Sequence, residues 1–534
     1  METKMVCPLC GQTHPSTAQF CPKTGQKIPA QQLCPNCGRE VQSSWRMCAF
    51  CGQKLSTANG PTPAITKRQG KRGVGIILTC GTIALLLVGV VVVMWFLYSD
   101  PIGAMFESLR AYPLLSSPTL TRTAEAVVET DTPSMPEPAT TNTPTATATT
   151  VVVSKPFTCT DALGCVDVGP NDPIHIAYAL VIAGPDATLG IDSRNGIEIA
   201  IAMKGQILGH DILLTGEDDG CSFEGGLAAG TKLAADPTIV SVIGTSCSSA
   251  ARAAMPLLSQ AGFVMVSPSN TAVDLTVAGN LNNHPGYLRT SLSDSVQGVT
   301  AARFAFEYLK VTKATTIHDG SLYAKKLQDV FAGTFEEMGG TITAREAIDH
   351  NGTDFKSALT SIAATGPEII YLPIFVEAGS LIVRQAKEVS GLENTYLMGA
   401  DGMFSPYVVE GAGAAIEGLF VSSPDLSAFA AEYTSVFLPK YSELFGTYPI
   451  SIFHAHAFDA TNIIFVAIEK VAVKDADGTL HIGRQALRDA MYATKDFKGL
   501  TGNLTCTPTG DCADPVIAVY EYHAGEYPPE RIWP

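Results

Sequence analysis

The sequence predicts an α/β protein made of two doubly wound parallel sheets, preceded by small zinc ribbons and one transmembrane helix. Three observations favour this fold class. Cys-x-x-Cys pairs cluster before residue 52, an apolar run free of Asp, Glu, Lys and Arg fills residues 73–99, and apolar strands alternate with helical patterns over residues 174–424. Strict alternation of strand and helix is typical of βαβ units. The region 156–534 exceeds one hydrophobic core, so we expect two lobes.

The second of two cysteine-rich modules, residues 31–56, has the spacing of a zinc ribbon. Its cysteines follow the pattern C-x2-C-x10-C-x2-C, and a glycine follows each pair. Zn²⁺ prefers four thiolates in a tetrahedron, which two such turns supply. A redox-active Cys-x-x-Cys would need a βαβ context that this segment lacks. We therefore expect structural Zn²⁺ bound by Cys34, Cys37, Cys48 and Cys51.

The first module, residues 1–30, looks like a degenerate copy of the second. Three cysteines remain, but Thr24 stands where a fourth would be expected. Two alternatives are open: His14 completes a Cys₃His zinc site, or packing alone holds the module together. In the first case the ligands are Cys7, Cys10, Cys21 and His14. Neither module has room for catalysis, so we expect this head to contact an unidentified cytoplasmic partner.

Residues 73–99 predict a membrane-spanning helix. The run holds 27 residues, and about 20 apolar residues suffice to cross a bilayer. Four basic residues end the preceding linker, residues 57–72, so the positive-inside rule places the N-terminus in the cytoplasm and the rest of the chain outside. A cleaved signal peptide is the alternative, but its apolar core would be shorter and nearer the N-terminus.

Charge is distributed unevenly along the chain. Residues 1–72 carry ten Lys and Arg against two Asp and Glu, a balance of +8, while the whole chain carries −16. The remainder therefore carries −24. A basic segment can indicate nucleic-acid binding, but four of these ten residues flank the apolar run, so membrane topology accounts for the excess. We expect no nucleic-acid partner.

Residues 100–155 predict an extended extracytoplasmic linker. Residues 118–150 contain 12 Thr and 5 Pro in 33 positions, with few large apolar side chains. Such a composition buries too little apolar surface to offset the entropy of the chain. We expect this segment to hold the following domain, residues 156–534, away from the membrane.

Hydroxyl side chains gather where two predicted strands of this domain end. The stretch "VIGTSCSSAARAAM" (242–255) runs from a strand into a helix, and "SPSNTAVDL" (267–275) follows the next strand. In open α/β sheets, ligands bind outside the carboxyl ends of the strands, and helix N-termini favour anions. Ser248 and Ser249 are expected to cap the helix. The sequence thus predicts a site for a small charged ligand at this edge.

The six cysteines of the domain predict three disulfides, as suits an oxidising compartment. Cys221 and Cys247 follow two successive strands, which we expect to be neighbours, so their sulfur atoms come within bonding reach. A free nucleophile at Cys247 is the alternative. Two short loops, "CTDALGC" and "CTPTGDC", predict the pairs Cys159–Cys165 and Cys506–Cys512.

The sequence offers no catalytic constellation. The stretch "GTSCSS" departs from G-x-S-x-G because Ser248 occupies the last glycine position. His454 and His456 are two residues apart on a predicted helix, so their rings point apart. The sequence contains no H-E-x-x-H motif, P-loop or dinucleotide fingerprint. We therefore do not expect an enzyme.

Several ordered motifs make the domain similar to a known family. The segments "GEDDGCSFEGG", "VIGTSCSSAARAAMPLLSQAGFVMVSPSNTAVDLT", "YLRTSLSDSVQG", "IHDGSLYAKKL" and "YLMGADGMF" resemble, in this order, the periplasmic leucine/isoleucine/valine-binding proteins, which are type 1 solute-binding proteins of ABC importers. The resemblance covers residues 172–534. It implies two α/β lobes joined by a three-segment hinge, which close on an amino acid and deliver it to a permease.

The same resemblance implies ligand-binding roles for particular residues. Ser248 matches the serine that meets the ligand carboxylate. Ser269, Asn270 and Thr271 match the loop that holds the carboxylate and the ammonium group. Asp401 matches an acidic residue that meets the ammonium group from the opposite lobe. Cys221 and Cys247 match the disulfide of the family.

Tyr323, Phe375 and Asp294 complete the implied site. Tyr323 matches the tyrosine after the "HD" turn, and Asp294 matches a cleft residue near the interlobe boundary. Two positions depart from the family: Asp401 is usually Glu, and Phe375 falls where a tyrosine often stands. These departures put a branched-chain preference in question, because relatives also accept polar amino acids, amides or urea.

The sequence therefore predicts a membrane-anchored extracytoplasmic protein that captures a branched-chain or related amino acid for an ABC importer. The alternative is a single-pass sensor that passes amino-acid occupancy to a cytoplasmic partner through the zinc-ribbon head. A flexible linker would transmit lobe closure poorly, which favours the transport role.

Overall fold

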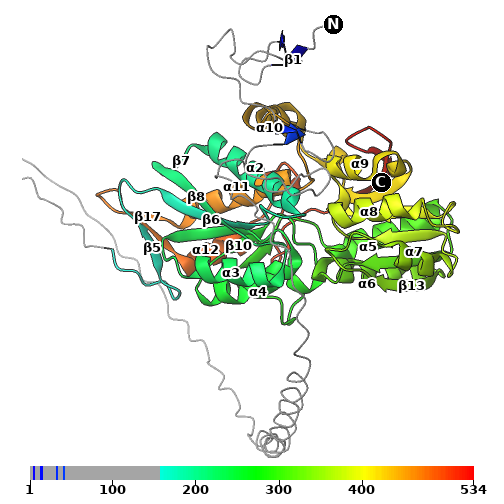
Figure 1. Cartoon of the computed structure of the whole chain (residues 1–534). Helices are drawn as coiled ribbons and strands as arrows, with labels where there is room; N and C mark the ends of the chain where they lie inside the picture. Colours follow the sequence, from blue (N-terminus) through cyan, green and yellow to red (C-terminus); the bar gives the residue numbers. More distant parts are fainter. Residues whose placement is uncertain (1–3, 7–12, 16–31, 34–39, 42–156) are drawn as a thin grey trace, which may run out of the picture. The chain divides into compact units, whose positions relative to one another are not determined.

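The computed structural model describes residues 4–6, 13–15, 32–33, 40–41 and 157–534 (Figure 1). The chain divides into two compact units, residues 1–150 and 151–534. In the first unit, two short antiparallel hairpins flank the first Cys-x-x-Cys pair of each predicted ribbon. Their strands are β1 (Lys4–Val6), β2 (Thr13–Pro15), β3 (Gln32–Leu33) and β4 (Glu40–Val41).

Three predicted segments lie outside the described residues, namely the basic linker at 57–72, the membrane-spanning helix at 73–99 and the extended linker at 100–155. Within the part of the chain that the structure describes, no helix has the length and apolar character needed to cross a bilayer. The proposed membrane anchor therefore stays a prediction from the sequence.

The first lobe of the second unit is built on a six-stranded sheet with the order β11-β10-β9-β6-β8-β7. Neighbouring strands are parallel, except in the β7–β8 hairpin. Every residue of β9, β10 and β11 is buried, as expected for strands covered on both faces. The strands are β6 (Ile174–Leu180), β7 (Gln206–Ile207), β8 (His210–Asp218), β9 (Ile239–Gly244), β10 (Met265–Ser267) and β11 (Tyr287–Arg289).

Helices cover both faces of this sheet (Figure 1). One apolar cluster joins a face to α2, α11 and α12, and another joins the opposite face to α3 and α4. Ile176 and Ala177, which are neighbours on β6, belong to different clusters because side chains alternate along a strand. The helices are α2 (Ala187–Lys204), α3 (Phe223–Ala234), α4 (Ser248–Gln260), α11 (His454–Val471) and α12 (Arg484–Tyr492).

The second lobe contains a seven-stranded sheet with the order β13-β12-β14-β15-β16-β21-β22. The first five strands are parallel, and β21 and β22 add antiparallel to their edge. The strands are β12 (Lys313–His318), β13 (Thr341–Ala347), β14 (Ile369–Leu372), β15 (Tyr396–Gly399), β16 (Leu419–Pro424), β21 (Ile517–Tyr522) and β22 (Glu530–Trp533). The helices of this lobe are α5 (Asp294–Arg303), α6 (Leu322–Glu337), α7 (Lys356–Ala363), α8 (Val376–Ala386) and α9 (Pro406–Ala412).

The chain crosses between the lobes after β11, after β16 and before β21. Two helices lie in the first lobe between the last two crossings, since α10 (Leu438–Phe445) packs on α2 and α11 packs on the first sheet. The two-lobed α/β fold with three connecting segments, predicted from the sequence, is confirmed. A small three-stranded sheet and a hairpin complete the first lobe. The sheet contains β17 (Val473–Lys474), β18 (Leu480–Gly483) and β5 (Cys165–Val168), and the hairpin contains β19 (Phe497–Gly499) and β20 (Gly502–Leu504).

All three predicted disulfides, Cys159–Cys165, Cys221–Cys247 and Cys506–Cys512, are present in the structure. The strand argument for Cys221 and Cys247 is wrong in one respect, because β6 lies between β8 and β9. The two cysteines stand beyond the strand ends, in the turn after β8 and at the N-cap of α4, where their Cα atoms are 4.9 Å apart. Cys247 therefore holds no free thiol.

Removal of the Cys221–Cys247 disulfide is expected to destabilise the domain more than removal of Cys159–Cys165. The two bonds close loops with sequence separations of 26 and 6 residues. The chain-entropy model assigns about 3.5 kcal/mol to the longer loop and about 2 kcal/mol to the shorter one. Urea unfolding followed by circular dichroism, on Cys221→Ala/Cys247→Ala and Cys159→Ala/Cys165→Ala, measures both losses. A larger loss for the shorter loop would contradict the entropic account.

Candidate ligand-binding site

The loops that follow β9 and β10 are bonded into one rigid unit. The Thr245 hydroxyl donates to the Asn270 side-chain oxygen at 3.1 Å, and the Ser269 hydroxyl donates to the Ser246 carbonyl at 2.8 Å. The Ser267 hydroxyl donates to the Thr245 carbonyl at 2.8 Å. All five residues are buried. The predicted hydroxyl-rich edge therefore exists, but most of its hydroxyl groups hold the two loops together.

The expected capping role of Ser248 and Ser249 is wrong. The N-cap of α4 is Cys247, and no side chain caps this helix. The Ser248 oxygen instead accepts a hydrogen bond from the backbone N–H of Ala272 at 3.2 Å. The Ser249 oxygen accepts from the backbone N–H of Leu322, in the second lobe, at 3.0 Å. Both serines therefore connect the α4 turn to other loops.

Thr271 and Asp294 meet at the boundary between the lobes. The backbone N–H of Asp294, the first residue of α5, donates to the Thr271 carbonyl at 2.9 Å. Both side chains are fully buried. The Thr271 hydroxyl lies beside the Asp294 carboxyl group, but neither this hydroxyl nor either carboxyl oxygen makes a well-formed hydrogen bond among the described residues. Buried polar groups without partners are uncommon in native proteins, so these atoms mark a position where a polar ligand fits.

Asp401 presents its carboxylate from the second lobe, directly after β15. Its Oδ1 atom accepts from the Gln297 amide at 2.7 Å and from the Tyr323 hydroxyl at 2.8 Å. The Phe375 ring lies beside Tyr323, with 5.3 Å between the ring centroids. Gln297 did not emerge from the sequence, although its position one helical turn after Asp294 was a signal for it.

Burial and the charge of Asp401 both make ionisation of Asp294 unfavourable. Burial raises the pKa of Asp294 to about 8, and the neighbouring charge of Asp401 adds to this shift. Burial also raises the pKa of Asp401 to about 6, although the hydrogen bonds from Gln297 and Tyr323 oppose it. Among the described residues, no lysine or arginine forms an ion pair with either carboxylate. A ligand that carries a positive charge would stabilise both ionised forms.

His350 joins the lobes at the edge of the cleft. Its Nε2 atom lies 3.1 Å from the carboxylate of Asp186, at the N-cap of α2, and its Nδ1 atom lies 3.2 Å from that of Asp319. The hydrogen bond with Asp186 is the largest cause that raises the pKa of His350 to about 10, followed by the bond with Asp319. With the Ser249–Leu322 contact, this pairing shows that the lobes are closed in this structure.

A hollow of about 20 Å³ lies between the hinge segments and is distinct from the candidate site. Thr290, His456 and Thr501 contribute to its lining, and none of the predicted ligand residues does. A space of this size accommodates a single water molecule. The candidate site is therefore defined by the unpartnered groups of the cleft.

Of the predicted zinc ligands, all seven cysteines lie outside the described residues, and only the backbone of His14 is described, in β2. Thiolate and imidazole groups are the donors that Zn²⁺ prefers, so this set fits the metal chemically. In the described ranges, no group of three or more His, Cys, Asp or Glu could hold a metal ion.

Comparison with known proteins identifies two families along the chain. The model of the periplasmic binding protein family matches residues 173–525, and that of the double zinc ribbon matches residues 7–52. The Leu/Ile/Val-binding protein BraC3 of Rhizobium johnstonii is 28% identical over 364 residues, which covers 66% of this chain and 92% of that protein.

Solved structures share the fold. The substrate-binding protein of a branched-chain amino acid transporter from Streptococcus pneumoniae, solved with isoleucine, has a TM-score of 0.59 at 24% identity and covers 68% of this chain and 100% of its own. A solute-binding protein of an ABC transporter from R. palustris, solved with benzoate, has a TM-score of 0.58 at 20% identity and covers 68% and 96%. Because the family model matches most of residues 151–534, and more than half of the whole chain, this chain belongs to the periplasmic binding protein family.

Proposed function

We propose that the chain captures an amino acid between its two lobes and delivers it to an ABC importer, and that residues 73–99 anchor it to the membrane with residues 156–534 outside. One observation carries this proposal: the cleft buries two carboxyl groups, Asp294 and Asp401, that form no ion pair among the described residues, and the Thr271 hydroxyl lies beside them. Three disulfides support an oxidising compartment for the domain.

A zwitterionic ligand satisfies both halves of this cleft. Its ammonium group pairs with the carboxylates, and its carboxylate accepts hydrogen bonds from the hydroxyl groups of Thr271 and Ser248. Hydrogen bonds to charged groups contribute roughly 1.5–3 kcal/mol each, so four or five of them support micromolar affinity after the costs of binding. Because the partners belong to both lobes, the ligand stabilises the closed form selectively.

An aromatic carboxylate is the contrasting ligand, because the R. palustris protein of the same fold was solved with benzoate. Benzoate carries one negative charge and no amino group. It would leave Asp294 and Asp401 without a positive partner in a buried site, so each carboxyl group would either take up a proton or remain an uncompensated ion at a cost of several kcal/mol. The two acids therefore favour an amino acid.

The sensor alternative has one observation in its favour, the double zinc ribbon match at residues 7–52. Zinc ribbons at the cytoplasmic end would offer a surface for a partner protein. Deletion of residues 1–60 distinguishes the two roles. Loss of amino-acid uptake would support a transport protein whose head is needed for assembly with the permease. Unchanged uptake with loss of a downstream response would support a sensor.

The full-length chain, purified in detergent, is expected to gain thermal stability with at least one free amino acid. A ligand at 100 times its dissociation constant adds about 2.7 kcal/mol to the stability of the domain. Differential scanning calorimetry with the twenty amino acids, their amides, urea and benzoate measures this gain. A shift with benzoate alone, or no shift after a denaturation–refolding cycle that removes copurified ligand, would contradict the proposal.

Asp401→Asn is expected to weaken amino-acid binding by about tenfold or more, because the amide cannot pair with an ammonium group and a charged hydrogen bond contributes at least 1.5 kcal/mol. Isothermal titration calorimetry measures the change. The matched control is Asp329→Asn, an exposed acid on α6 whose side chain is 56% accessible, which should bind as wild type does. Equal affinities of wild type and Asp401→Asn would remove Asp401 from the site.

The contribution of the His350–Asp186 pair to binding is expected to fall as the pH rises toward 10, because the charged form of His350 links the lobes. Asp319 belongs to the same lobe as His350 and stays beside it, so only the pairing with Asp186 depends on closure. The pKa of His350 is about 10 in the closed form, so this contribution is complete below the pKa that His350 has in the open form, beside Asp319 alone, and is lost as the pH passes through 10.

Asp186→Asn removes the part of this pH dependence that comes from the interlobe pair. Titration of wild type and variant from pH 6 to 10 isolates it, because ionisation of the amino acid itself affects both proteins equally. The affinities should differ at pH 6 and converge at high pH. A constant ratio across this range would contradict the role of His350.

A further inference from the structure

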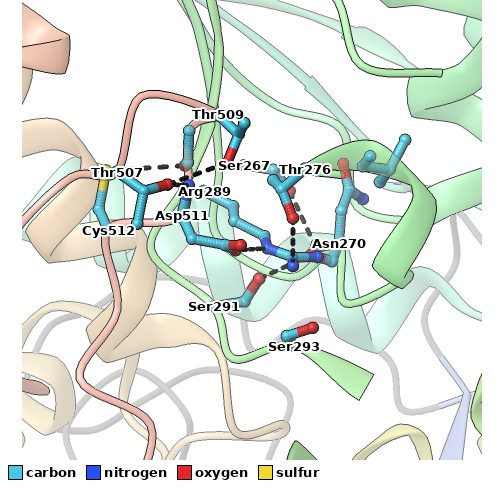
Figure 2. A network of polar contacts seen from close by, with 12 residues as sticks. Ser267, Asn270, Thr276, Arg289, Ser291, Ser293, Thr507, Thr509, Asp511 and Cys512 are labelled. Atoms are coloured by element: carbon cyan, nitrogen blue, oxygen red, sulfur yellow. Dashed lines mark hydrogen bonds and ion pairs between the residues drawn. The ribbon is translucent and has the colours of Figure 1, made fainter. Parts of the chain in front are cut away.

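Arg289 contacts the loop of residues 270–276, called the ligand loop below because it carries Thr271 (Figure 2). Its side chain is completely buried. One guanidinium nitrogen, Nη1, donates to the carbonyl oxygens of Asn270 at 3.2 Å and Ala272 at 2.9 Å. The other, Nη2, donates to the Thr276 hydroxyl at 2.8 Å. The two carbonyls flank Thr271, so this single side chain fixes the backbone on both sides of the residue whose hydroxyl lies beside the Asp294 carboxyl group.

The remaining donor of the guanidinium group, Nε of Arg289, donates a hydrogen bond to the Asp511 carboxylate (Figure 2). It is the only carboxylate that pairs with Arg289 among the described residues. A buried guanidinium without a counter-ion is strongly unfavourable, so the position of Asp511 determines how firmly Arg289 is held. The Asp511 side chain is 34% exposed, so substitution there disturbs the packing less than substitution of Arg289 does.

The loop closed by the Cys506–Cys512 disulfide presents Asp511. This loop pairs with β11 as an added edge, since the Arg289 N–H donates to the Gly510 carbonyl at 2.9 Å and the Cys512 N–H donates to the Arg289 carbonyl at 3.0 Å. Gly510 permits the close approach: its φ is +102°, and a Cβ atom there would lie 2.2 Å from the Tyr287 carbonyl oxygen. The loop thus docks in one register against the strand that carries Arg289.

We propose that Arg289 is a positioning residue for ligand binding and that Asp511, held by the Cys506–Cys512 loop, keeps it in place. The inference rests on the proposed amino-acid binding, and it assigns the C-terminal disulfide a role beyond closing a turn. Loss of Asp511 or of this disulfide would loosen the guanidinium, and with it the Asn270–Ala272 backbone that orients Thr271. Ligand affinity then falls although no residue of the cleft is altered.

The test compares ligand affinity among variants of the full-length chain. The probe is L-leucine, or the amino acid that gives the largest thermal shift with wild type if that is a different one. Asp511→Ala should weaken binding several-fold, up to about tenfold, because at most the free energy of one charge-assisted hydrogen bond is lost from the frame that orients Thr271. Asp511→Glu, which keeps the charge, should restore part of the affinity, and Cys506→Ser/Cys512→Ser should weaken binding as well.

The matched control is Cys159→Ser/Cys165→Ser, which removes a disulfide of the same sequence separation that lies outside the Arg289 contacts. Titrations are run at 10 °C on samples whose circular dichroism shows full folding, so that lost stability does not appear as lost affinity. The control should bind as wild type does, which separates positioning from general destabilisation.

Three results would overturn the inference. If Asp511→Ala binds with wild-type affinity, the positioning role of Asp511 and Arg289 is wrong, and the proposed function is unaffected. Equal weakening in the two double-cysteine variants, or an affinity of Asp511→Glu no better than that of Asp511→Ala, assigns the effect to stability. No binding of any amino acid by wild type removes the proposed function, and this inference with it.

Discussion

Closure of the cleft depends on how the negative charges of two buried carboxylates are balanced. Asp294 and Asp401 both lose solvation when the lobes close, and the charge of Asp401 makes ionisation of Asp294 still harder. Two such acids in contact with water would be unremarkable, but closure removes the water that stabilises them. A positive group between them therefore favours the closed form more than the open one. In the proposed function, ligand capture and lobe closure follow from the same electrostatic requirement.

The two lobes hold their site residues in place in different ways. In the first lobe, hydroxyl–carbonyl bonds lock the loops after β9 and β10 together, so Thr271 is held in a fixed frame. In the second lobe, Gln297 and Tyr323 bind the same oxygen of Asp401 and so orient its carboxylate. Each half is preorganised before the lobes meet, which lowers the entropy cost of binding.

Local patterns in the sequence were sufficient for the fold and for the hydroxyl-rich ends of β9 and β10, because alternating strands and helices determine where parallel strands end. They were insufficient for the contacts within the site. Ser248 and Ser249 have the composition of helix caps, yet their oxygens accept from Ala272 and Leu322. Gln297 and Arg289 were missed because their carboxylate partners are 104 and 222 residues away in the sequence. No local pattern encodes such pairs.

The Arg289–Asp511 pair also limits where the hinge can bend. One crossing between the lobes begins directly after Arg289, and another begins directly after Cys512, whose backbone is bonded to Arg289. The two crossings run side by side, since Thr290, Leu292, Ala513 and Pro515 line the same small hollow. Their lobe-1 ends are therefore fixed to each other by an ion pair and a disulfide-closed loop. Within these two of the three crossings, opening has to be absorbed by residues 290–293 and 513–516, and Pro515 restricts the backbone of the second segment further. The element that orients Thr271 is thus the same one that defines the fixed end of the hinge, which couples the geometry of the ligand loop to the path of closure.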